Sequence, residues 1–271
     1  MPRSTIACTK TGRRERSDVR VQSGQASKPS LFIVDSMESP NEMHYNLMNR
    51  DLTELPLLRN VTELYCNDNR LTELPEYPLL NRLYCHRNRL NDLPAYPELV
   101  ELKCDDNALT FLPEYPKLER LWADDNQIRD LSSYPELTFL SANNNRLGWL
   151  PAYPKLSILW CQNNRLITLD EFPSLTQLNC KNNGLVSLAP MPKLTHLSCQ
   201  NNRLVELPEC PELTSLHCEG NNIVAMPYYP KLSYLDLTGN PVAAMMENPR
   251  NVREYHRLYQ RQTKKRAPDR D

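Results

Sequence analysis

The sequence contains no hydrophobic run long enough to span a membrane, and its first thirty residues contain no apolar core of the kind that a secretory signal peptide needs. It has no C-x-x-C or H-E-x-x-H motif and no Cys–His spacing suited to zinc. His86, His196 and His217 are scattered, and no Ser or Cys nucleophile pairs with a histidine by spacing. These absences predict a soluble, non-enzymatic protein that needs no metal or other cofactor.

The sequence does contain an asparagine at every nineteenth residue along most of its length. The members of this series are Asn69, Asn88, Asn107, Asn126, Asn145, Asn164, Asn183, Asn202, Asn221 and Asn240. The elements of an ordinary globular fold differ in length, so such a fold does not need this register. One structural unit is therefore stacked along the chain.

The first half of each unit has the pattern of a short strand. Leu83 and Cys85 are two residues apart, so both point to one side of a strand. Tyr84 and His86 point to the other side. Asn88 follows where the chain turns, and its amide is expected to bond backbone groups that the turn leaves unpaired. Repeated in every unit, these amides predict an internal polar ladder.

The second half of each unit reads Leu-Pro-x-Tyr-Pro in most copies. Two prolines within four residues fix φ and keep the residue before each proline extended, so no helix fits there. We expect the tyrosine to bury its ring and to leave its hydroxyl in water. Because neighbouring strands lie about 4.8 Å apart, ten such coils give a solenoid roughly 45 to 50 Å long.

The full pattern, L-x-x-L-x-C-x-x-N-x-L-x-x-L-P-x-Y-P-x, resembles the leucine-rich repeat. The Leu-Pro step and the short repeat are similar to those of bacterial effectors that act inside host cells and of short-repeat proteins of large DNA viruses. The resemblance covers about residues 45–242. It implies an α/β-solenoid class that is mainly β: a right-handed, curved solenoid with a parallel sheet on the concave side and extended segments on the convex side.

The chain departs from that effector class at both ends. The class usually has a helical N-terminal cap, and some members carry a C-terminal ubiquitin-ligase domain with a catalytic cysteine. Fewer than thirty residues follow the last coil here, and none is a cysteine, so no ligase activity is expected.

The sequence predicts one domain with five successive segments. Residue Arg50 takes the asparagine position in an imperfect first coil, and Asn248 with Pro249 is expected to start the capping helix. The predicted segments are a disordered basic tail (1–30), an N-terminal cap with a partial first repeat (31–51), the repeat array (52–242), a C-terminal capping helix (243–262) and a basic tail (263–271).

Seven of the nine cysteines occupy one inward strand position, three residues before a ladder asparagine. They are Cys66, Cys85, Cys104, Cys161, Cys180, Cys199 and Cys218. Ala123, Ala142 and Leu237 fill the same position in other coils, which indicates selection for a modest apolar volume rather than for metal binding or disulfides. A row of buried thiols favours a reducing compartment, which means the cytoplasm, or a host cytoplasm if the protein is exported.

The outward strand positions, with Lys103 and Ser141 in their central column, define the concave face, where function must be sought. Large apolar side chains are concentrated in its first two thirds and are bordered by charged residues, as in protein interfaces. Aromatic residues also favour strands for packing reasons alone, and this alternative stays open. The predicted partner-binding residues are Tyr65, Tyr84, Arg82, His86, Asp105, Arg120, Trp122, Asp124, Phe139, Ile158, Trp160 and His217. Phe111 and Trp149 suggest a smaller lateral patch.

Charge is segregated along the chain. Residues 1–30 and residues 249–271 each carry a net charge of +5, which leaves −11 for residues 31–248 in a total of −1. The leading hypothesis is a monomeric scaffold that binds another protein on its concave face. The alternative is a structural, assembly or nucleic-acid-associated protein that contacts a polyanion through its basic ends.

Overall fold

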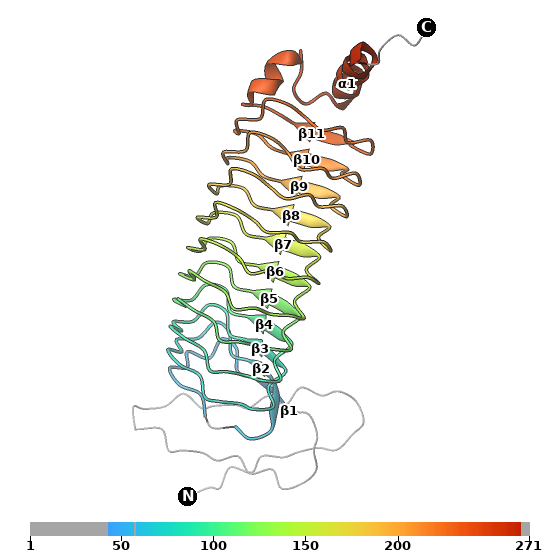
Figure 1. Cartoon of the computed structure of the whole chain (residues 1–271). Helices are drawn as coiled ribbons and strands as arrows, with labels where there is room; N and C mark the ends of the chain where they lie inside the picture. Colours follow the sequence, from blue (N-terminus) through green and yellow to red (C-terminus); the bar gives the residue numbers. More distant parts are fainter. Residues whose placement is uncertain (1–42, 57, 267–271) are drawn as a thin grey trace, which may run out of the picture.

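Eleven strands form one parallel sheet, and their order in the sheet is their order in the chain (Figure 1). The computed structural model describes residues 43–56 and 58–266, with side chains over 44–56 and 58–260. The predicted tail at 1–30, residues 31–42 of the predicted cap and residues 267–271 lie outside the described residues. The strands are β1 (Met43–Asn46), β2 (Val61–Tyr65), β3 (Arg82–Tyr84), β4 (Glu101–Lys103), β5 (Arg120–Trp122), β6 (Phe139–Ser141), β7 (Ile158–Trp160), β8 (Gln177–Asn179), β9 (His196–Ser198), β10 (Ser215–His217) and β11 (Tyr234–Asp236).

Neighbouring strands are in register at a spacing of nineteen residues. Leu83 of β3 pairs with Leu102 of β4, which pairs with Leu121 of β5. These leucines are fully buried and belong to one core that continues from coil to coil. Because the return segments carry two prolines, they stay extended and add no helix between strands. The predicted solenoid with a parallel sheet is confirmed.

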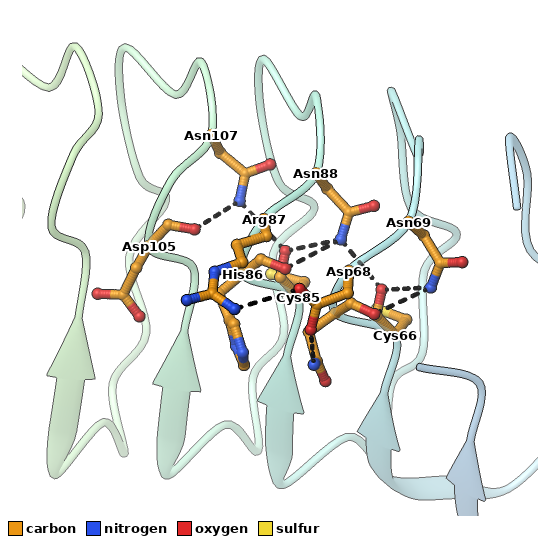
Figure 2. A network of polar contacts seen from close by, with 10 residues as sticks. Cys66, Asp68, Asn69, Cys85, His86, Arg87, Asn88, Asp105 and Asn107 are labelled. Carbon is orange, nitrogen blue, oxygen red and sulfur yellow. Dashed lines mark hydrogen bonds and ion pairs between the residues drawn. The ribbon is translucent and has the colours of Figure 1, made fainter. Parts of the chain in front are cut away.

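The asparagine ladder satisfies the backbone where each coil turns, as Figure 2 shows for its first members. Asn88 donates through Nδ2 to the carbonyl of Cys85 and to that of Cys66 in the preceding coil, at 3.0 Å each. Its Oδ1 accepts from the N–H of Leu71 at 3.0 Å. The predicted structural role is confirmed. At the first coil Arg50 replaces part of it, donating through Nη2 to the Asn46 carbonyl at 2.9 Å.

The tyrosines of the return segments are buried to their hydroxyl groups. Tyr96 and Tyr115 stack with ring centroids 6.4 Å apart, and both are fully buried. The Tyr96 hydroxyl donates to the carbonyl of Pro75 in the preceding coil at 3.1 Å. The expectation of a solvated hydroxyl is therefore wrong, because the extended return of the preceding coil leaves a backbone carbonyl within reach of each tyrosine hydroxyl.

The cysteines of the repeat array lie in the core with free thiols. Cys85, Cys104 and the other members of the row are buried, as is Cys210 in a tyrosine position. Burial raises the pKa of the Cys180 thiol to about 12 and that of the Cys210 thiol to about 11. The packing role is confirmed for these residues; Cys8 lies outside the described residues.

The residue before each ladder asparagine has a left-handed backbone conformation, with φ between 53° and 76°. This column comprises Asp68, Arg87, Asp106, Asp125, Asn144, Asn163, Asn182, Asn201, Gly220 and Gly239. Asn, Asp and Gly tolerate such φ values best. Its exposed amides form a second ladder, in which Asn163 donates to Asn144 at 2.5 Å and Asn182 to Asn163 at 2.6 Å.

The C-terminal helix begins later than predicted. A 3₁₀ helix (Pro241–Met245) follows β11, and α1 covers Val252–Arg266. Asn248 does not cap α1; its Oδ1 accepts from Arg250 N–H in the turn before the helix. Asn251 is the cap, since its Oδ1 accepts from Glu254 N–H at 3.1 Å, as an N-cap side chain does with the third helical residue.

Helix α1 covers the last coil, as the sequence predicted. Tyr255 is buried, donates its hydroxyl to the Pro227 carbonyl at 2.7 Å and accepts from Tyr229 N–H at 2.9 Å. Arg253 and Arg257 face outward. Helix α1 therefore covers the C-terminal end of the hydrophobic core.

Candidate protein-binding face

Six side chains of β2 to β7 form a continuous stack across the concave face, which we call the aromatic stack: Tyr65, Tyr84, Lys103, Trp122, Phe139 and Trp160. Tyr65 and Tyr84 are parallel, with centroids 4.5 Å apart. The Lys103 ammonium lies 5.2 Å from the Tyr84 centroid and 4.5 Å from that of Trp122. Phe139 contacts Trp122 at 4.6 Å and Trp160 at 5.3 Å. Such contacts hold large rings on an otherwise open sheet.

The stack passes around Ser141. In the sheet Ser141 lies between Trp122 and Trp160, but it is fully buried and does not line the face as expected. Its hydroxyl donates to the Asp124 carboxylate at 2.7 Å. Phe139, two residues earlier on β6, supplies the ring that bridges the two indoles. The small residue therefore lets a neighbouring column complete the stack.

Two buried glutamates fix the first half of the stack. Glu63 and Glu101 are only 8% and 6% exposed. The Tyr84 hydroxyl donates to Glu101 at 2.9 Å, Arg120 donates to the same carboxylate at 2.6 Å, and Tyr65 donates to Glu63. Arg82 lies 3.8 Å from Glu63. These bonds orient both tyrosine rings and both arginines.

Asp105 and Asp124 cap backbone N–H groups at the strand ends. The Asp105 carboxylate accepts from Asp124 N–H at 3.0 Å, and that of Asp124 accepts from Asn143 N–H at 2.6 Å. Burial raises the pKa of Asp105 to about 6, and burial also raises the pKa of Asp124. Neither forms an ion pair with a described residue. The Lys103 ammonium only partly offsets the effect of burial on the pKa of Asp105.

The predicted histidines differ from each other. His86 is half-buried beside the stack, and its Nδ1 has no hydrogen-bond partner among the described residues. Burial lowers its pKa, which favours the neutral ring. Its place in the column after the strand is visible in Figure 2. His217 on β10 stacks on Tyr234 at 4.3 Å, three strands beyond Trp160. Ile158 pairs with Phe139 in the sheet and so lies next to the aromatic stack, whereas His217 lies away from the stack.

Lys103 was not among the predicted partner-binding residues, although it joins the stack as a cation between two rings. Asp106 and Asp125, which the sequence predicts to border the face together with Asp105 and Asp124, lie in the left-handed column. The predicted lateral residues Phe111 and Trp149 are 54% and 51% exposed. A further apolar stripe comprises Ile167, Val186, Val205 and Val224. Each of these residues occupies a fixed position of the nineteen-residue repeat, so aligning the repeats on that spacing groups them by position.

Within the described part of the chain, no three His, Cys, Asp or Glu side chains are close enough together to hold a metal ion. No described helix is both long and apolar enough to cross a membrane.

Fold and repeat together define the chain as a leucine-rich repeat protein. It is similar to YopM from Yersinia enterocolitica WA-314, with 32% identity and a TM-score of 0.70 over 74% of this chain and 47% of YopM. It is also similar to YopM of Yersinia pestis, described as a leucine-rich effector, with 34% identity and a TM-score of 0.67 over 72% of this chain and 60% of YopM. The chain thus spans about half of these relatives' length. No protein-family model matches, and a search of curated proteins gives no match.

The fold recurs in the plant peptide hormone receptor RGFR1 in complex with RGF2, at 20% identity and a TM-score of 0.54 over 67% of this chain and 36% of the receptor. Leucine-rich repeat neighbours that include effectors and a receptor support a protein-binding scaffold in general.

Proposed function

We propose that this chain is a non-enzymatic scaffold that binds a partner protein on its concave face, with the aromatic stack as the centre of contact. The stack carries the proposal, because two tryptophans, a phenylalanine and two tyrosines are held in contact on an open sheet rather than in the core. Aromatic anchors surrounded by polar residues are typical of interface hot spots.

Fixed ring positions favour binding because little side-chain freedom is left to lose. The hydroxyls of Tyr65 and Tyr84 are held by Glu63 and Glu101. Trp160, at the end of the stack, keeps 37% of its surface exposed. An interface that orders few new side chains retains more of its contact energy as affinity.

The thiol row supports a proposed site of action. The eight buried free cysteines favour a reducing compartment, and the similarity to YopM favours a host-interaction role in a host cytoplasm. Fractionation of the native protein checks this part; recovery only from an oxidising extracellular fraction contradicts it.

Affinity capture with a matched control tests the binding face. Trp122→Ala with Trp160→Ala removes two anchors, whereas Phe111→Ala with Trp149→Ala removes two exposed rings from the flank. Proteins captured by the wild type from native or candidate host lysates are expected to be lost with the first variant and kept with the second. An interface tryptophan commonly contributes 2 kcal/mol or more, about thirtyfold in affinity. Equal capture by wild type and the Trp122/Trp160 variant refutes the proposal, provided that the variant keeps its circular dichroism.

A further inference from the structure

Over strands β2 to β5, the arginines of the concave face are paired with carboxylates, and the carboxylates without such a pair lie at one place. Arg82 lies against Glu63 at 3.8 Å, Arg120 pairs with Glu101 at 2.6 Å, and Arg87 pairs with Asp68 at 3.4 Å. Four carboxylates have no such partner among the described residues. We call them the acidic edge: Asp105, Asp106, Asp124 and Asp125.

The acidic edge lies beside the middle of the aromatic stack. Its residues directly follow β4 and β5, which pair so that Lys103 faces Trp122. Asp106 and Asp125 are exposed, with φ of 54° and 53°, and Asp125 accepts only the Asn144 amide, at 2.8 Å. The Lys103 ammonium partly opposes the effect of burial on the pKa of Asp105, but none of the four carboxylates forms an ion pair with a described residue.

The position of Lys103 shows that the aromatic stack can hold a cation. Its ammonium lies between Tyr84 and Trp122 at cation–π distance from both rings. The same rings are open to a partner on the solvent side, because Tyr84 and Trp122 are only partly buried. A second cation placed over this region meets ring faces and carboxylates together.

We infer that the segment bound by the concave face is a cationic polypeptide, whose Lys or Arg side chains lie along the acidic edge while its apolar side chains contact the aromatic stack. This inference rests on the proposed function and adds the charge of the partner to it. Burial already disfavours the charged forms of Asp105 and Asp124. A partner cation beside them replaces part of the solvation that burial removed, so it stabilises these two carboxylates more than it stabilises a carboxylate in water.

Fluorescence anisotropy with synthetic probes tests the inference. Three short labelled peptides share length and apolar residues but carry arginine, glutamine or glutamate at the same positions. The full chain is compared with Asp106→Asn/Asp125→Asn, which removes the two exposed charges without touching a strand-end cap. The matched control is Glu114→Gln/Glu171→Gln, two exposed acids of the return side.

The expected result is binding of the arginine peptide at least about tenfold tighter than the glutamine peptide at low salt, with a loss at high salt. The acidic-edge variant weakens that binding several-fold and the control variant leaves it unchanged. Arginine-peptide binding that both variants leave unchanged overturns the inference, since the peptide then sits elsewhere on the acidic solenoid.

Two further outcomes separate this inference from the proposed function. If the glutamine or glutamate peptide binds as well and Trp122→Ala/Trp160→Ala abolishes that binding, the face binds protein but the inferred charge is wrong. If binding of the arginine peptide appears only after the seven Lys and Arg of residues 1–30 are replaced by glutamine, the edge belongs to the chain's own N-terminal segment, and an external partner is refuted.

Discussion

Replacement of one ladder asparagine is expected to lower the free energy of unfolding of the solenoid by several kcal/mol, although little of the asparagine's surface is exposed. Asn145 is 8% exposed and donates to the Ala123 carbonyl at 2.8 Å and to the Asn143 carbonyl at 3.0 Å. Its Oδ1 accepts from Ile128 N–H at 3.0 Å. Asn145→Ala leaves these buried groups without partners. At about 1 to 3 kcal/mol per unsatisfied group, the loss is roughly 3 to 5 kcal/mol after partial relaxation.

A matched substitution isolates the buried bonds from the loss of an amide as such. Asn163 is one coil further, exposed, and has φ of 57°. Asn163→Gly removes a stacked amide while keeping a residue that adopts this φ without strain, so its cost is expected below about 1 kcal/mol. Asn145→Asp keeps the acceptor for Ile128 N–H but directs a carboxylate oxygen at the Ala123 and Asn143 carbonyls, so near neutral pH it should cost at least as much as Asn145→Ala.

Urea unfolding followed by circular dichroism measures all three variants. Because each coil contacts only its neighbours, the Asn145→Ala variant is expected to lower the urea midpoint and to broaden the transition if the two halves separate. A loss below about 1 kcal/mol, or one equal to that of Asn163→Gly, refutes the assignment of the ladder as the main support of the turns.

Three other changes have defined outcomes. In the Cys8→Ser variant the eight buried thiols are expected to resist a thiol reagent in buffer and to react in denaturant, because burial raises their pKa values; fast reaction in buffer contradicts this. Asp105→Asn keeps the cap on Asp124 N–H. Since the folded pKa of about 6 exceeds the ordinary value of 3.8, the carboxyl group's contribution to stability is complete below pH 3.8 and is lost as pH rises through 6. The variant should therefore exceed wild type at pH 7.5 by at most about 3 kcal/mol and match it near pH 4, as measured by urea unfolding at both pH values. Tyr255→Phe leaves Tyr229 N–H unpaired beneath α1 and should cost about 1 to 3 kcal/mol in thermal or urea unfolding; no change contradicts the capping role.

Much of the fold is predictable because one register repeats. The spacing of Leu83, Cys85 and Asn88 fixes strand, core and turn in each coil, and errors do not accumulate along the array. The helix start was missed because Asn248-Pro249 and Asn251 are both plausible starts by sequence. The side-chain bond from Asn251 to Glu254 N–H decides between them.

The candidate site is less predictable, because alternation places a residue on a face but not its neighbours' rings. Ser141 was expected to line the concave face, yet it is fully buried and its hydroxyl donates to the Asp124 carboxylate. Lys103 was seen as an outward residue, but its position between two rings depends on rotamers. Trp122, Trp160 and Tyr84, in contrast, follow from strand parity alone.

Site-specific photocrosslinking tests the central claim most directly. A photoreactive phenylalanine analogue replaces Trp160 on the concave face, or Trp149 on the flank as a control of the same chemistry and somewhat greater exposure, 51% against 37%. A captured partner is expected to crosslink at residue 160 and not at residue 149. Crosslinking at residue 149 alone, or equally at both positions, contradicts binding on the concave face.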